Sequence, residues 1–197
     1  MRHLLTTSLA SLALSGCMTI SGHNLSELKP ISPKATVSIE ESVSKDFTFE
    51  LDGGQMVTDN KMGRTLNELI LDNWKDKNYI SGYEYVPLEK FTNSTDYTLT
   101  LKGSQTGESS IAMQVISGLT LMMIPYTVNT TMDLEYVLKN VKTGATYNSK
   151  AKETVKSWSW LLLLPALPFA GNGMATAADH IAEHVYQDFV SQGAFQN

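Results

Sequence analysis

Cysteine is almost missing from this chain, since its 197 residues include only one. No disulfide can form within it, so a packed core must hold the fold even in an oxidising compartment. An excess of basic charge is missing too, because 15 Lys and Arg stand against 20 Asp and Glu. Nucleic-acid-binding domains usually carry a basic face, so we expect no nucleic-acid partner.

The sequence also lacks long apolar runs and the common catalytic motifs. Its apolar stretches fall short of the roughly twenty residues that a membrane-spanning helix needs. There is no G-x-S-x-G elbow of a serine hydrolase. There is no G-x-G-x-x-G or Walker A loop for a nucleotide either. We therefore expect neither a cofactor nor catalysis.

The one cysteine, Cys17, follows a short basic start and an apolar run at residues 4–14. Small residues after such a run mark a secretory cleavage site. The string Leu14-Ser15-Gly16-Cys17 resembles the lipobox of bacterial lipoprotein precursors. The resemblance implies that the Cys17 thiol receives a diacylglyceryl group and that a peptidase cuts between Gly16 and Cys17. The new amino terminus would then be acylated, for example with palmitate.

Lipidation at Cys17 would make the membrane the first partner of the chain. Two or more acyl chains are needed for stable anchoring, and the lipobox resemblance implies three. In enteric bacteria an Asp directly after the acylated cysteine retains a lipoprotein in the inner membrane. Met18 stands at this position, so the resemblance implies the outer membrane, with the protein facing the periplasm. Lipidation would also remove the only thiol from metal binding and catalysis.

The chain divides into a signal peptide at 1–16, a lipidated tether at 17–35 and a single periplasmic domain at 36–197. The tether is expected because its Ser, Gly, Asn, Lys and Pro residues show no sustained apolar period. In the domain, polar and apolar residues alternate in several stretches, and this pattern predicts half-buried strands. These stretches are 37–39, 47–51, 83–88, 97–101, 126–138 and 146–158. The last two form a hairpin, and the polar residues 103–110 are expected to be a loop.

Two further stretches have the apolar spacing of amphipathic helices. At 60–76 the predicted buried stripe is Leu66, Leu69, Ile70 and Trp74. At 172–192 it is Met174, Ala177, Ile181, Val185 and Phe189. The resulting fold class is α+β, a mostly antiparallel sheet with two helices packed on one face.

Two apolar segments, 119–125 and 158–169, flank the hairpin. A turn centred near Lys142 places Tyr126 opposite Trp158, so both segments leave the same end of the hairpin as one apolar lobe. A buried core strand is the favoured interpretation of 119–124. For 158–169, a buried strand and an exposed contact surface for a membrane interface or a partner both remain open. The candidate contact residues are Leu121, Met122, Ile124, Trp158, Trp160, Leu163, Leu164 and Phe169.

The string His180-Ile181-Ala182-Glu183-His184 matches the H-x-x-E-H pattern of inverted zinc proteases. Two His at i and i+4 on a helix can share a metal, with the Glu as general base. The context is poor, because that family takes a third ligand well downstream and thirteen residues follow His184. The favoured interpretation is that both His flank a buried helical stripe, and no metal is expected.

The sequence therefore predicts an outer-membrane lipoprotein that serves as a non-catalytic accessory, assembly or envelope-maintenance factor. It would contact an envelope protein or lipid through the apolar lobe. The order of its elements is similar to that of small lipoproteins that brace outer-membrane assembly and secretion machines. One alternative is a module that holds an apolar ligand between sheet and helices. A further alternative is a zinc hydrolase at His180, Glu183 and His184.

Overall fold

The computed structural model describes residues 17–21, 37–51, 57–58, 60–159 and 173–195. Its strands are β1 (Cys17–Ser21), β2 (Ser38–Val43), β3 (Thr48–Leu51), β4 (Val57–Thr58), β5 (Gly82–Tyr85), β6 (Tyr97–Ser109), β7 (Tyr126–Asn140) and β8 (Thr146–Ser159). Its helices are α2 (Asn60–Asp76), α3 (Ile111–Leu119) and α4 (Gly173–Ser191), with a 3₁₀ turn η2 (Leu88–Lys90).

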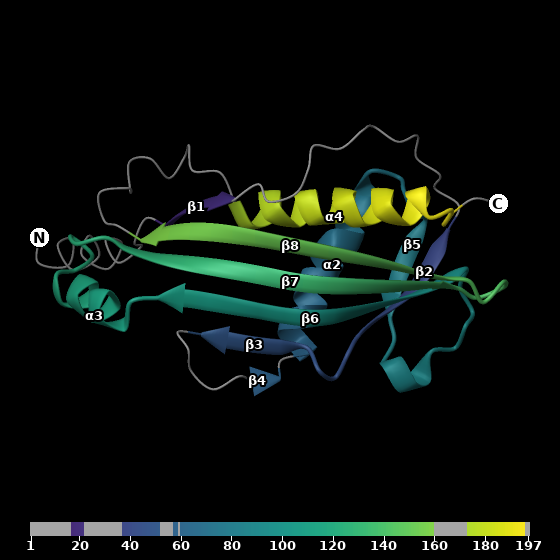
Figure 1. Ribbon diagram of the computed structural model, residues 1–197, viewed down its shortest axis with the longest axis horizontal. Helices are drawn as coiled ribbons and strands as arrows, with labels where there is room; N and C mark the ends of the chain where they lie inside the picture. Colours follow the sequence, from purple (N-terminus) through teal and green to yellow (C-terminus); the bar gives the residue numbers. More distant parts are fainter. Residues whose placement is uncertain (1–16, 22–36, 52–56, 59, 160–172, 196–197) are drawn as a thin grey trace, which may run out of the picture.

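The strands form one sheet in the order β1-β8-β7-β6-β2-β5, with β3 beside β6 and β4 beside β3. The long antiparallel strands β6, β7 and β8 run the length of the molecule (Figure 1). The α+β class is confirmed. The expectation of a mostly antiparallel sheet is wrong, because β2 runs parallel to β5 and β6, and β3 runs parallel to β6. Parallel neighbours need a crossover connection, and α2 lies in the one between β2 and β5.

Helix α2 begins and ends where the sequence pattern predicts, and most of its apolar stripe is buried. Leu66, Ile70 and Trp74 lie in the core, together with Leu71. Leu69 is the exception to the predicted stripe, because its side chain is exposed. Of the stripe predicted for α4, four members are buried, namely Ala177, Ile181, Val185 and Phe189. The side chain of Met174 lies outside the described residues.

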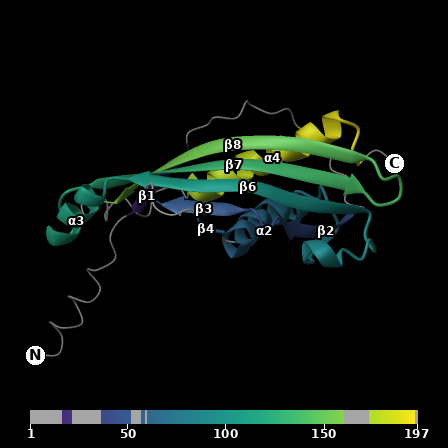
Figure 2. The same cartoon turned by 60° about the horizontal axis from the view of Figure 1, so that its bottom comes forward.

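Helices α2 and α4, whose course can be followed in Figures 1 and 2, contact each other. Their buried residues share one core with alternate residues of the sheet. The indole of Trp74 is central to this core, since its ring lies edge-on to Tyr186, with centroids 5.5 Å apart, and to Phe189 at 6.3 Å. From β7 the core receives Met132, Leu134, Tyr136 and Leu138, the alternation that the sequence predicts. Side chains thus fill the space between the sheet and these helices.

Three segments differ from expectation. The predicted loop at 103–110 is instead the second half of β6, which continues to Ser109. The predicted tether begins with a strand, because residues 17–21 form β1 on the edge of the sheet beside β8. Residues 111–119 form a third helix, α3, beyond the end of β6 (Figure 2). Among the described residues, no helix has the length and apolar character to cross a bilayer.

Candidate functional site

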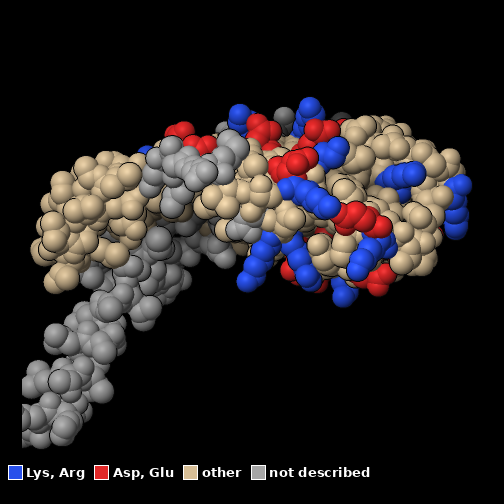
Figure 3. Space-filling model, turned by 90° about the horizontal axis from the view of Figure 1, so that it is seen from below, with Lys and Arg blue, Asp and Glu red and all other residues tan. Residues whose placement is uncertain are grey.

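A row of three residues marks where charge ends on the sheet. Glu108 of β6, Asn129 of β7 and Lys156 of β8 stand side by side in register. Beyond this row, residues 109–128 and 157–159 contain no Lys, Arg, Asp or Glu. We call these two stretches the apolar tip. Figure 3 shows the contrast on one face, where charged side chains are scattered over the body of the molecule and the end that carries α3 shows no blue or red.

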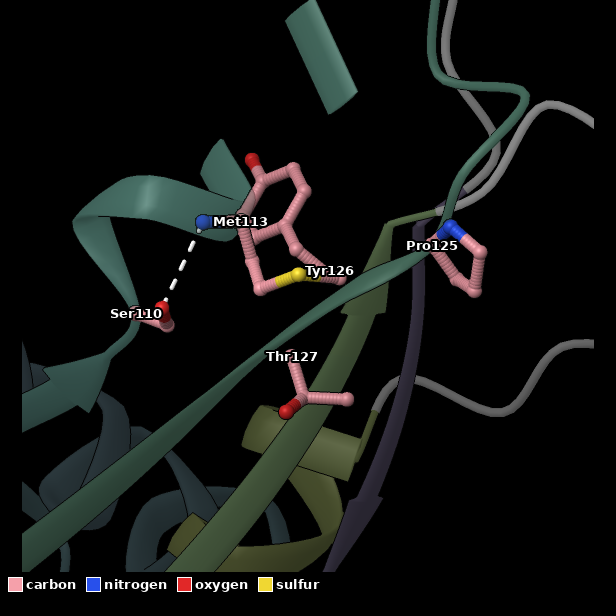
Figure 4. A pocket seen from close by; sticks show the side chains of 5 residues that line it. All are labelled: Ser110, Met113, Pro125, Tyr126 and Thr127. Atoms are coloured by element: carbon pink, nitrogen blue, oxygen red, sulfur yellow. Dashed lines mark hydrogen bonds between the residues drawn. The ribbon is translucent and has the colours of Figure 1, made fainter. Parts of the chain in front are cut away.

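Helix α3 is the main element of the apolar tip. Ser110 caps its start, since its Oγ accepts a hydrogen bond of 3.3 Å from the backbone N–H of Met113 (Figure 4). Such a cap satisfies one of the free amides of the first turn. Of its residues only Ser117 is buried. The helix therefore stands apart from the core, which is formed by α2, α4 and the sheet.

Apolar side chains of the tip face outward. Leu119 is 81% exposed and Leu121 is 79% exposed. The other exposed large apolar residues here are Ile111, Met113, Val115, Ile116, Met123 and Ile124. The interpretation of 119–124 as a buried core strand is therefore wrong. A continuous apolar run signals burial only when the rest of the chain supplies a cover, and these residues lie past the end of both core helices.

The turn after α3 has a strained backbone. Leu121 and Met122 have φ angles of 51° and 62°, a left-handed region that residues with long side chains seldom adopt. Backbone hydrogen bonds hold this turn, from Leu121 N to Gly118 O at 3.2 Å and from Met122 N to Ser117 O at 2.6 Å. Leu121 is exposed, whereas the sulfur of Met122 lies 3.8 Å from the hydroxyl of Ser159 at the end of β8.

A small pocket of about 110 Å³ lies where α3 meets the start of β7. Figure 4 shows the residues that line it, which are Ser110, Met113, Pro125, Tyr126 and Thr127. The pocket has no charged group. Its size suits a side chain or an acyl-chain segment rather than a cofactor.

Strand β1 brings Cys17, the predicted acylation site, to the apolar tip. Cys17 pairs with Ser159 of β8, and Ser159 pairs in turn with Tyr126 of β7. Neighbouring strands lie about 4.8 Å apart, so the backbone of Cys17 is about 10 Å from that of Tyr126. Alternate apolar residues at Met18 and Ile20 were the sequence signal for this strand.

The remaining predicted contact residues have different outcomes. Tyr126 lies opposite Ser159 and not Trp158, because the hairpin turn is centred half a residue later than expected. Trp158 is therefore on the face of the sheet opposite to the core, where it is half-buried, and the Nζ of Lys156 lies 4.9 Å from its ring centroid. Four members lie outside the described residues, namely Trp160, Leu163, Leu164 and Phe169.

The H-x-x-E-H residues lie on α4, where Glu183 joins it to the end of α2. Its carboxylate accepts hydrogen bonds from Lys77 Nζ at 2.9 Å, Tyr79 Oη at 3.0 Å and Gln187 Nε2 at 3.0 Å. Burial raises the pKa of Glu183, but these bonds outweigh it and lower the pKa. The Nε2 of His184 lies 3.2 Å from the Lys150 carbonyl oxygen. Within the described ranges, no group of three or more His, Cys, Asp or Glu side chains is arranged to hold a metal, so His180, Glu183 and His184 form no such group.

Comparisons with known proteins assign no family. No family model and no curated protein matches the chain. Among solved structures, the chain is similar to a Xanthomonas campestris protein with the family-model label DUF330, at 10% identity over 86% of this chain and 94% of that one, with a TM-score of 0.41. It is similar to PelC, solved as a dodecamer from Paraburkholderia phytofirmans, at 12% identity over 93% and 100% of the two chains, with a TM-score of 0.36. It is also similar to a neuraminyllactose-binding hemagglutinin homolog from Helicobacter pylori, at 9% identity over 84% and 92%, with a TM-score of 0.38.

Proposed function

We propose that this protein is a lipid-anchored, non-catalytic accessory factor of the bacterial outer membrane. It faces the periplasm and contacts an envelope protein or lipid through its apolar tip. The observation that carries the proposal is the register of β1, because it pairs the predicted acylation site, Cys17, with the strand that ends in the tip. Anchor and contact surface then lie at one end of the molecule.

Two carboxylates of the described fold serve structural roles, which supports a non-catalytic function. Glu183 uses its carboxylate to join α4 to Lys77 and Tyr79 in the segment that follows α2. Glu40 is likewise occupied, because its carboxylate accepts hydrogen bonds from the loop residues Thr92, Asn93 and Ser94. A general acid or base has to reach a substrate in a cleft, whereas these carboxylates hold parts of the fold together.

The alternative of an apolar ligand held between sheet and helices has less support. The aromatic rings of Trp74, Tyr186 and Phe189 already occupy that space in edge-to-face contacts. Closely packed interiors leave few voids larger than a water molecule. The exposed apolar area lies instead at the tip, and a contiguous apolar patch of this kind usually marks a contact site.

The experiment that tests the proposal follows the anchor in cells. We expect the chain to incorporate a palmitate analogue and to fractionate with the outer membrane. Cys17→Ala should abolish incorporation, and Met18→Asp should shift an acylated protein to the inner membrane in an enteric host. Incorporation that persists in Cys17→Ala, or a wild-type protein found in the soluble fraction, would contradict the proposal.

A further inference from the structure

We infer that the apolar tip inserts into the same membrane leaflet that holds the acyl chains of Cys17. This inference rests on the proposed function, since it takes the acylated Cys17 as given. It selects lipid, and not a protein, as the occupant of the tip. It makes the protein monotopic, held by its acyl chains and by α3.

The direction of the chain at Cys17 places the anchor at the level of the tip. Strand β1 runs antiparallel to β8, so it starts opposite Ser159 and moves away from the tip toward Val155. Acyl chains on the first residue of β1 therefore start beside residues 157–159. Acylation of the amino terminus removes its positive charge, and the anchor then adds no charge to an end that has none.

The distribution of apolar residues around α3 favours lipid over a protein partner. Successive residues of a helix are 100° apart, so the exposed residues Ile111, Val115, Leu119, Ile116 and Met113 cover an arc of about 200°. A helix that binds one protein surface typically shows an apolar stripe of about half that width. A bilayer surrounds whatever enters it, and a helix that is apolar over most of its circumference suits that environment.

The length of α3 suits one leaflet. Its 9 residues span about 13 Å at 1.5 Å per residue. The hydrocarbon of a bilayer is about 30 Å thick, or about 15 Å per leaflet. The helix is therefore short enough to lie within one leaflet.

The border of the tip has the composition of a membrane interface. Trp158 and Lys156 lie together on the outer face of β8, with the ammonium group over the indole ring. Tyr126 lies at the same end of β7. Trp and Tyr are enriched at the headgroup level of membrane proteins, and long Lys side chains reach toward the headgroups while their stems cover apolar surface. The row at Glu108 and Lys156 would then lie just outside the hydrocarbon.

The turn that ends α3 is a helix C-cap, held by the hydrogen bonds from Leu121 N to Gly118 O and from Met122 N to Ser117 O. Two consecutive left-handed residues, Leu121 and Met122, cost free energy in the folded protein. Such strain persists where surrounding structure or function requires it. Here the cap requires it, and Leu121, which is exposed at this cap, adds to the apolar surface that the tip presents to lipid.

The test uses the acylated full-length protein on vesicles of phosphatidylethanolamine and phosphatidylglycerol. Because acylation blocks the only native thiol, a single new cysteine can be labelled selectively with an environment-sensitive fluorophore. Leu119→Cys places the fluorophore on the tip, and the matched control Thr143→Cys places it on the exposed turn at the far end of the hairpin. Both positions are exposed, so neither change disturbs the core.

We expect spin-labelled lipids to quench the fluorophore at residue 119 and to leave the one at residue 143 bright. Fluorophores at Val115 and Ile116, which lie 100° apart on α3, should both be quenched. A fluorophore at residue 119 that is no more quenched than the one at residue 143, on protein that still floats with the vesicles, would overturn the inference and leave the lipid anchor intact. Quenching of only one of the pair at 115 and 116 would indicate a protein contact, such as a second copy, and would also overturn it. Protein that does not float would overturn the proposed function itself.

Discussion

The side-chain amide of Asn67 on α2 donates a hydrogen bond to the carboxylate of Glu41 on β2, inside the core. Both residues are fully buried. The second carboxylate oxygen of Glu41 and the side-chain oxygen of Asn67 have no hydrogen-bond partner. Burial therefore raises the pKa of Glu41 from 4.5 to about 7, against the lowering effect of Asn67 and of the nearby Arg64.

Glu41→Gln is expected to change how stability depends on pH. Because the folded pKa of Glu41 lies above the unfolded value, the folded state binds more protons between about pH 4.5 and pH 7, and stability falls as pH rises through this window. Glutamine cannot ionise, and its NH₂ can donate to the Asn67 oxygen. Urea unfolding measures the free energy of unfolding of both proteins. From pH 4.5 to pH 8 the difference between variant and wild type should shift in favour of the variant by on the order of 3 kcal/mol, at 1.36 kcal/mol per pKa unit. An equal difference at both pH values would contradict this assignment.

Glu40→Gln is expected to have the opposite effect on how stability depends on pH. Glu40 points to the other face of β2, and burial raises its pKa, but hydrogen bonds from Thr92, Ser94 and Asn93 outweigh this and hold the pKa below 4.5. The ionised Glu40 therefore stabilises the fold above about pH 4.5, and this stabilisation is lost as the pH falls through the pKa of Glu40 in the folded state. The variant should lose about 2 kcal/mol at pH 7, since charged hydrogen bonds are replaced by weaker ones. The same urea titration checks this, and a deficit that grows in acid would contradict it.

Trp74→Phe is expected to weaken the joint between the two core helices. The indole Nε1 donates a hydrogen bond of 2.7 Å to the carbonyl of Ala182 on α4, and the smaller ring leaves space in a fully buried site. We expect a loss of about 2 kcal/mol, seen as a Tm lower by roughly 4–8 °C. Trp158→Phe is the matched control, because Trp158 lies on the opposite face of the sheet, and its Tm should change little. A larger effect in the control would contradict the assignment of the core.

Gly103→Ala is expected to damage the sheet. Gly103 has a φ of 132°, and an added Cβ would lie 2.1 Å from the carbonyl oxygen of Asp133 on β7. We expect a loss of roughly 3 kcal/mol or more, as for other strained backbone sites. Gly118→Ala on α3 is the control, because nothing lies within 4 Å of its added Cβ and alanine favours a helix. Thermal unfolding of both variants tests the pair, and equal stability of the two would contradict the prediction.

Sequence patterns predict best where one face of an element packs on the core. Helix α2 and strand β7 have the expected period because their buried and exposed faces differ in polarity. The second half of β6 has no such period, because Gly103 and its polar neighbours do not alternate with apolar residues. This segment is a strand because it pairs with β3 and β7. The parallel pairing of β2 could not be predicted from the sequence either, because it depends on the position in the sheet to which the chain returns after α2.

The candidate site was predicted in part. The predicted pairing of the hairpin strands was off by one residue. It correctly placed the segment 119–125 at one end of the sheet. The exposure of this segment could not be predicted from its composition, because the same apolar residues occur in buried strands. The strand at Cys17 was missed, because five residues with two apolar members look like a linker until β8 provides a partner.

The pairing of β1 with β8 also limits how far the hairpin turn can lie from the membrane. If Cys17 is acylated as proposed, its pairing with Ser159 in the sheet would leave little slack between the lipid and the domain. Strand β7 has 15 residues and extends about 50 Å at 3.3–3.4 Å per residue. With the row at Asn129 just outside the hydrocarbon, the 11 residues of β7 beyond it, 130–140, would hold the hairpin turn at 141–145 at most about 40 Å from the bilayer.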